Sequence, residues 1–193
     1  MKEINGRKAD YPVLDIFLKR HSPRAMSSEA LKEDELMTLF EAARWAPSSS
    51  NRQPWKFIYA KRETSEFEVF LGLLEDGNRE WCIRAGALIV LASYNLKKDG
   101  TMNGSHSFDA GSAWENLALQ ATEMSLVAHS MSGFDHDMAR EKLEIPQDYT
   151  IEAMIALGRP GSIADLSEKN QARETPNQRK EIKEIVSEGK FAN

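Results

Sequence analysis

The stretch that most constrains the fold is an apolar run at Ala87–Ser93, which reads A-L-I-V-L-A-S. A short continuous run of this kind is typical of a strand that is covered on both faces. A second buried strand is expected at Ile151–Leu157. No apolar run approaches the ~20 residues that a membrane-spanning helix needs. We therefore predict a sheet whose buried strands are packed between layers of helices.

Apolar residues at helical spacing lie on both sides of these strands. The expected helices are at residues 11–19, 32–45, 67–74, 109–125 and 137–143, and the other expected strands are at 56–61 and 126–131. The helix at 109–125 is long enough to be a crossover connection. Residues 162–178 are polar and look like a linker, and the tail at 179–191 has too few apolar residues to form a core of its own. The pattern predicts α+β architecture, with a central mixed or antiparallel sheet flanked by helices.

The size of the chain, 193 residues and 21.8 kDa, fits one domain over residues 1–193. A formal net charge of -5 argues against general binding of nucleic acid or anionic membranes. The single cysteine, Cys82, excludes an intrachain disulfide, and the four histidines include no close pair that would indicate a metal site. The N-terminus lacks the apolar core of a signal peptide, so we expect a cytoplasmic protein.

The segment Ala43–Phe57, A-R-W-A-P-S-S-S-N-R-Q-P-W-K-F, joins an expected helix to an expected strand. Pro47 forces the residue before it out of the α region, so the helix must end near Ala46. The residues that follow are dense in hydrogen-bonding groups and lie between two tryptophans. That composition suits a loop that closes over a planar ligand rich in heteroatoms. It equally suits an ordinary helix-to-strand connection.

Three further clusters are candidates for ligand binding. Arg20-His21-Ser22-x-Arg24 offers forked guanidinium donors that match phosphate oxygens, and Arg179-Lys180 offers two more cations. Either cluster could instead be solvated surface. In Ser132-Gly133, the glycine would let backbone amides approach a ligand closely. Glycine-rich nucleotide-binding loops of the G-x-G-x-x-G and P-loop types are absent.

Taken together, these segments resemble the nitroreductase family, the dimeric FMN-dependent oxidoreductases. R-H-S-x-R at 20–24, the loop at 46–55, Asn78 seven residues before Ala85, S-G-F-D at 132–135 and R-K at 179–180 occur in the order found in that family. The pattern G-x-x-x-x-N-L-x-L-x-A, which begins at Gly111, is similar to the family's central helix.

The resemblance implies an FMN site at the interface of a homodimer. Arg20, His21, Ser22, Arg179 and Lys180 would bind the phosphate and ribityl chain. Arg24 and Asn78 would lie at the pyrimidine edge, where a cation favours the negative charge of reduced flavin. The amides of Ser132 and Gly133 would face N5. The remaining set would come from the other subunit: Pro47, Ser48, Ser49 and Asn51.

The same resemblance implies that flavin N5, and no side chain or metal, carries the chemistry. NAD(P)H would reduce FMN, and a nitroaromatic, quinone or similar planar acceptor would then oxidise it in a ping-pong reaction. The polar linker and tail at 162–193 would embrace the second protomer. Three alternatives remain: a non-catalytic flavin store or sensor, an interaction domain that has lost flavin, and a reductive dehalogenase, which the short 95–107 loop disfavours.

Overall fold

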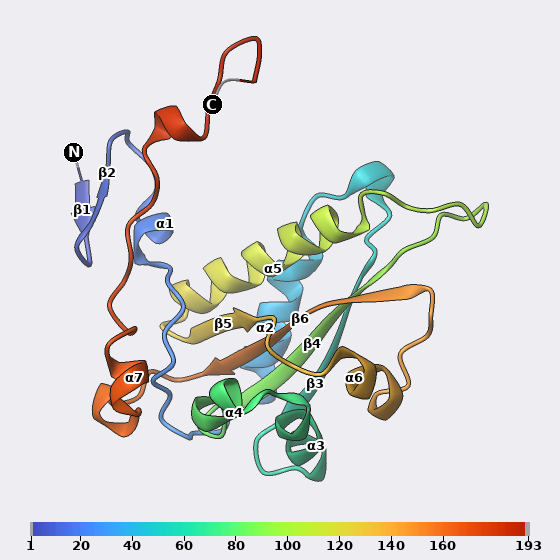
Figure 1. The fold of residues 1–193 in the computed structure, drawn as a ribbon, viewed down its shortest axis with the longest axis horizontal. Coiled ribbons are helices and arrows are strands. Elements are labelled where there is room, and N and C mark those ends of the chain that lie inside the picture. The colour runs from blue at the N-terminus through green and yellow to red at the C-terminus, as the bar shows by residue number, and fades with distance from the viewer. Residues whose placement is uncertain (1, 192–193) are drawn as a thin grey trace.

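A four-stranded sheet in the order β3-β4-β6-β5 forms the centre of the computed structural model, which describes residues 2–191 (Figure 1). The strands are β3 (Trp55–Lys61), β4 (Ala87–Tyr94), β5 (Val127–Met131) and β6 (Tyr149–Gly158). Each neighbouring pair is antiparallel. The α+β fold with an antiparallel sheet is therefore confirmed.

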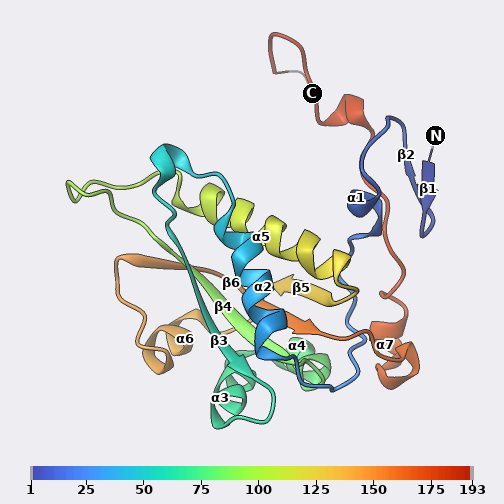
Figure 2. The same ribbon diagram turned by 180° about the vertical axis from the view of Figure 1, so that it is seen from behind.

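Helices cover both faces of this sheet (Figures 1 and 2). One face packs against α2 (Glu33–Arg44) and α5 (His106–Glu123), and the other against α3 (Ser65–Leu73), α4 (Asp76–Cys82) and α6 (His136–Lys142). The side chains of β4 alternate between the two cores. Leu88 and Val90 face the α3 side, whereas Ile89 and Leu91 face the α2 side. The expectation that Ala87–Ser93 is covered on both faces is confirmed.

The long helix α5 connects β4 to β5. Both strands pair antiparallel with β6, which lies between them, so β4 and β5 run in the same direction. The crossover that the sequence predicted is thus present. It leaves β5 at the edge of the sheet, paired with β6 alone among the described strands.

At the N-terminus the structure contains a hairpin that the sequence analysis missed. It consists of β1 (Lys2–Ile4) and β2 (Arg7–Ala9), and Asn5 and Gly6 have φ angles of 53° and 71°. An Asn-Gly pair is a strong local signal for a two-residue hairpin turn, because both positions require positive φ. The first helix, α1 (Asp15–Lys19), begins later than expected, after Pro12 and an exposed Leu14.

The C-terminal region is more structured than the predicted polar linker. It contains two short helical segments, Ile163–Asp165 and α7 (Glu168–Gln171), and the side chains of Leu166, Asn170 and Glu174 are buried. Beyond them the chain runs beside the N-terminal hairpin and then projects from the rest of the molecule, through a 3₁₀ turn at Ile182–Glu184 (Figures 1 and 2). The apolar side chains of this tail are exposed: Ile182, Ile185, Val186 and Phe191.

Close backbone contacts join the segment after Arg24 to the chain that leaves β6. The Gly161 amide donates to the Ala25 carbonyl at 3.0 Å, and Met26 forms a bridge with Pro160. A Cβ on Gly161 would lie 2.3 Å from the carbonyl carbon of Met26. This contact needs glycine, and it fixes the position of the basic residues that precede Ala25.

We predict that Gly161→Ala destabilises the fold by about 3 kcal/mol, because the added methyl group overlaps backbone that cannot move aside. Gly72→Ala is the matched control. Its Cβ would meet no atom within 4 Å, and Gly72 lies inside α3, so alanine should stabilise by up to about 1 kcal/mol. Urea unfolding of both variants measures the two effects. If Gly161→Ala unfolded at the same urea concentration as the wild type, the backbone contact at Gly161 would not be rigid.

Candidate functional site

Arginine side chains from three distant parts of the chain line one cavity of about 490 Å³, called the basic cavity below. Its arginines are Arg7 of β2, Arg20 and Arg24 of the segment after α1, and Arg173 and Arg179 of the C-terminal region. The other lining residues are His21, Ser22, His129, Glu174, Thr175, Pro176 and Asn177. Arg20, His21, Ser22, Arg24 and Arg179, which the sequence singled out, are thus brought together. Lys180 instead lines a smaller neighbouring cavity with Arg7 and Arg179.

Arg7 ties the three segments to one another. Its buried guanidinium donates to the carbonyl oxygens of Arg20 and Asn177, the latter at 3.0 Å. Burial lowers the pKa of Arg7, and the nearby charges of Arg179 and Arg20 lower it further. The fold therefore holds like charges together at a cost in free energy, which an anion in the cavity would offset.

Arg24 also lines the basic cavity, beside Glu174. Burial and the charge of Arg173 lower the pKa of Arg24, while Glu174 opposes that shift. The Glu174 carboxylate is buried and accepts hydrogen bonds from the backbone amides of Arg24 and Ala25 at 2.7 and 2.8 Å. Its second oxygen, Oε2, has no hydrogen-bond partner within the described structure.

His129 of β5 closes the inner side of the basic cavity. Its Nδ1 lies 2.9 Å from the Pro23 carbonyl oxygen, and its ring is 4.7 Å from the Trp81 ring, centroid to centroid. Burial lowers the pKa of His129, and so does the charge of Arg24. The hydrogen bond to Pro23 acts in the opposite direction. The charged imidazolium is therefore disfavoured, and because the Pro23 carbonyl oxygen can only accept, Nδ1–H donates to it.

The residues after β5 form a second part of the site, next to α4. The Asn78 side chain donates to the Gly133 carbonyl at 3.0 Å. A Cβ at Gly133 would lie only 2.7 Å from Asn78 Nδ2 and 2.9 Å from a carboxylate oxygen of Glu75. Asn78 and Gly133, which the resemblance assigns to the pyrimidine edge and to N5 of the flavin, are in contact. His129 of β5 lines the basic cavity, and Gly133 follows four residues later, just after the end of the strand. β5 therefore connects this region to the basic cavity.

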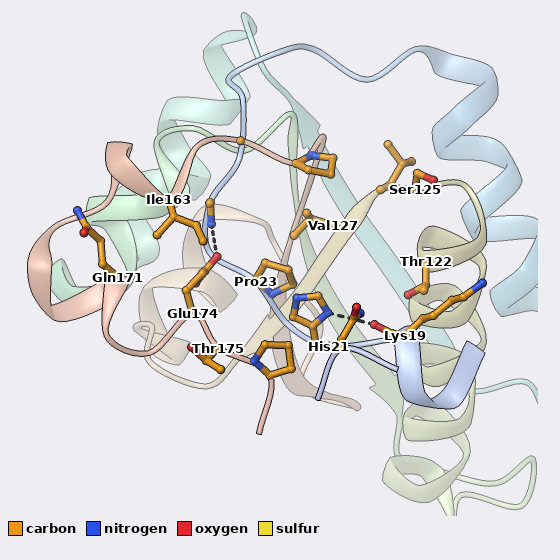
Figure 3. Close-up of a pocket in the computed structure, with 16 residues that line it drawn as sticks. Lys19, His21, Pro23, Thr122, Ser125, Val127, Ile163, Gln171, Glu174 and Thr175 are labelled. Atoms are coloured by element: carbon orange, nitrogen blue, oxygen red, sulfur yellow. Dashed lines mark hydrogen bonds between the residues drawn. The ribbon is translucent and has the colours of Figure 1, made fainter. Parts of the chain in front are cut away.

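A larger cavity of about 620 Å³ adjoins the basic cavity and shares His21, Glu174, Thr175 and Pro176 with it. Figure 3 shows Ile163, Gln171 and Glu174 on one side of this space and Thr122 and Ser125 on the other. Glu174 thus lies in the wall between the two cavities.

The loop at 47–53 lies elsewhere, at the N-terminal end of α5 (Figures 1 and 2). The Ser49 amide donates to the Asp109 carboxylate at 3.2 Å, and Ser48 Oγ accepts from the Gln53 amide at 3.0 Å. Pro47, Ser49 and Asn51 are exposed. Within one chain, none of these loop residues lines the basic cavity or the larger cavity beside it, and the larger cavity includes Thr122 at the other end of α5.

Neither the cysteine nor a metal centre gives a competing site within residues 2–191. The Cys82 thiol is buried, its pKa is raised by that burial, and it lies 3.7 Å from the Met131 sulfur. Among residues 2–191, no cluster of histidine, cysteine and carboxylate side chains could hold a metal ion. Within the same described range, no helix is long and apolar enough to span a bilayer.

Sequence reasoning missed Arg7, His129, Arg173 and Glu174. Arg7 could have been suspected from the Asn5-Gly6 turn signal, which predicts a hairpin rather than a free terminus. Arg173 and Glu174 lie in a polar stretch whose sequence resembles any solvated segment. Their contacts with Arg24 span about 150 positions, and no local pattern reports them.

Comparisons with known proteins show which family the chain resembles. The nitroreductase family profile matches residues 17–68 and 59–159. A crystal structure of an FMN-containing oxidoreductase is 37% identical, with a TM-score of 0.96 over 100% of this chain and 99% of that one. An Archaeoglobus fulgidus protein provisionally named NADH dehydrogenase/NAD(P)H nitroreductase is 25% identical over 167 residues, 80% of this chain and 89% of that protein. The oxygen-insensitive NAD(P)H nitroreductase of Enterobacter cloacae is 36% identical over 58 residues, 30% of this chain and 27% of that enzyme. The chain described here belongs to the nitroreductase family.

Proposed function

We propose that this protein is an FMN-dependent oxidoreductase that transfers electrons from NAD(P)H to nitroaromatic, quinone or similar planar acceptors by a ping-pong mechanism. The observation that carries the proposal is the convergence of five arginines on one cavity at the edge strand β5. Its volume lies in the range of cofactor-sized pockets. A phosphate-bearing ligand would relieve the repulsion that the fold imposes on these side chains.

The phosphate end of FMN would be bound by Arg20, His21, Ser22 and Arg179, with Lys180 at the margin. Arg20 already donates to Ser22 Oγ at 3.3 Å, so the guanidinium and the hydroxyl lie side by side. Arg7 keeps its guanidinium on backbone carbonyls and contributes charge rather than a free donor.

The ring end of FMN would lie toward Arg24, Asn78, Ser132 and Gly133. When bound, FMN would supply N5, an atom that accepts and delivers hydride. The absence of a Cβ at Gly133 leaves room for Asn78 and keeps the local backbone close to the ligand's path. Arg24 would favour the negative charge that FMN gains on reduction.

Completion of the site by a second chain would bring Pro47, Ser48, Ser49 and Asn51 to the flavin. Two large apolar side chains beside this loop, Trp45 and Phe108, are 72% and 79% exposed. A second chain that covered these two side chains would remove their apolar surface from water. We propose a homodimer with FMN at its interface and with the tail at 179–191 lying on the partner.

The first test is the absorbance spectrum of the purified protein, followed by anaerobic addition of NADPH and then NADH. We expect a flavin band that bleaches with at least one donor and returns when a quinone or nitroarene is added. Double-reciprocal plots against both substrates should be parallel. Intersecting lines would contradict the ping-pong mechanism. A flavin that stays oxidised would indicate a store or sensor, and a colourless protein that ignores added FMN would refute both functions.

A complementation experiment tests the dimeric site. A clamp variant, Arg20→Gln with Arg24→Gln, and a loop variant, Ser48→Gly with Asn51→Gly, should each bind FMN roughly 10- to 100-fold more weakly, because each loses charged or polar contacts. Glycine keeps the positive φ of 53° at position 51 available.

When the two variants are refolded together, about half of the dimers should be mixed, and each mixed dimer carries one intact site. About a quarter of all sites should therefore regain the wild-type Kd. If each variant is refolded alone, no sites should recover. Failure to recover in the mixture, with both variants folded, would place the loop and the clamp of one site on the same chain.

The stability of the FMN-free protein should fall as the pH decreases from about 7 toward 5 because of His129. The pKa of His129 is lower in the folded state than its ordinary value of 6.5, so the unfolded chain binds the proton first. The contribution of the neutral His129 ring to stability is fully present above pH 6.5, and it is lost as the pH falls toward the pKa of His129 in the folded state. His129→Asn, which keeps a donor for Pro23, should flatten this part of the urea-unfolding profile. An unchanged slope would show that His129 is not responsible.

A further inference from the structure

Glu174 is the only carboxylate among the residues that line the basic cavity in the described structure. It occupies the wall between that cavity and the larger one, and its side chain is 5% exposed. A buried carboxylate within a group of arginines would ordinarily form a bidentate pair with one of them. Glu174 does not.

The two oxygens of Glu174 have different environments. Oε1 accepts hydrogen bonds from the amides of Arg24 and Ala25, which fixes the backbone at these two residues. Oε2 lies 3.9 Å from an Arg24 guanidinium nitrogen, beyond hydrogen-bonding distance, and has no other partner within the described structure. An unsatisfied buried oxygen of this kind is costly and calls for a role.

The guanidinium of Arg24 keeps most of its N–H donors for a ligand. Its Nη1 makes only a long contact of 3.4 Å with the Arg173 carbonyl oxygen. Glu174 thus holds the main chain of Arg24 firmly, while the charged end of that side chain makes one long hydrogen bond, to the Arg173 carbonyl oxygen. The carboxylate remains close enough to reduce the positive potential that Arg24 presents to the cavity.

We propose that Glu174 is a positioning residue that sets the reduction potential of bound FMN by restraining Arg24 and partly balancing its charge. The inference rests on the proposed FMN-binding function. A cation near the pyrimidine edge favours the charge gained on reduction, and a neighbouring carboxylate opposes that effect. Removing the carboxylate charge should therefore make the bound flavin easier to reduce.

The test is Glu174→Gln in the FMN-loaded protein, with Glu168→Gln as the matched control. Glutamine keeps an oxygen for the two amides and removes the charge, while Glu168 is exposed in the same C-terminal region. Equilibration with a reference dye should give a midpoint potential about 30 mV higher for Glu174→Gln, which corresponds to a tenfold change in the two-electron equilibrium. Glu168→Gln should match the wild type. An unchanged or lower potential in Glu174→Gln would overturn the proposal.

Two further variants separate charge from packing. Glu174→Asp keeps the charge but shortens the side chain, so it should weaken FMN binding several-fold while shifting the potential much less than Glu174→Gln. Arg24→Gln leaves Glu174 uncompensated and should lower the potential. In the Arg24→Gln background, Glu174→Gln should no longer act through the cation, so its upward shift should differ from that in the wild type. Identical shifts in both backgrounds would contradict an action through Arg24.

Arg24→Gln also decides the matter if Glu174→Gln does not fold, as judged by thermal unfolding. A potential that is unchanged in Arg24→Gln would by itself remove the basis of the proposal. Failure of the underlying function is distinct, because then the wild-type protein itself would bind no FMN.

Discussion

Repulsion among arginines gathered around one buried guanidinium, that of Arg7, is the constraint on which the ligand-binding end of this molecule depends. Three parts of the chain that are far apart in sequence meet at the basic cavity, and each brings at least one guanidinium group. The contacts that hold them together are polar: Arg7 on backbone carbonyls, and Glu174 on the amides of Arg24 and Ala25. Such an arrangement gains little from apolar burial, and bringing like charges together costs free energy. An anion that binds only the folded state would therefore stabilise it.

The position of the cavity follows from the topology of the sheet. β4 and β6 lie in the interior of the sheet, and their side chains are taken up by the two cores. β5 has one free edge, since the α5 crossover places it beyond β6. The N-terminal hairpin and the C-terminal region gather at this end of the sheet (Figure 1). An edge strand offers both a rigid base and open space, and His129 of β5 lines the basic cavity whereas Ile155 of β6 is fully buried.

The sequence predicts the framework well because the framework is local. The apolar run Ala87–Ser93 identifies a strand buried on both faces, and Pro47 marks the end of α2 to within a few residues. The site is less predictable because its members are related only through tertiary structure. Glu174 is an ordinary carboxylate in a polar segment until the fold places it beside Arg24. The family resemblance pointed to Arg20, His21, Ser22, Arg24 and Arg179, all of which line the basic cavity, but it gave no indication of Glu174.

The loop at 47–53 has a defined shape within the single chain, and this bears on how a dimeric site would form. Ser50, Asn51 and Gln53 all have positive φ, a strained backbone conformation for residues other than glycine. Hydrogen bonds from Ser49 to Asp109 and from the Gln53 amide to Ser48 hold that conformation. The entropy cost of ordering the loop is incurred when the chain folds. Binding of this loop to a second chain would therefore not incur that cost again. In the proposed dimer, association therefore brings together two prearranged halves, a charged clamp from one chain and a rigid polar loop from the other.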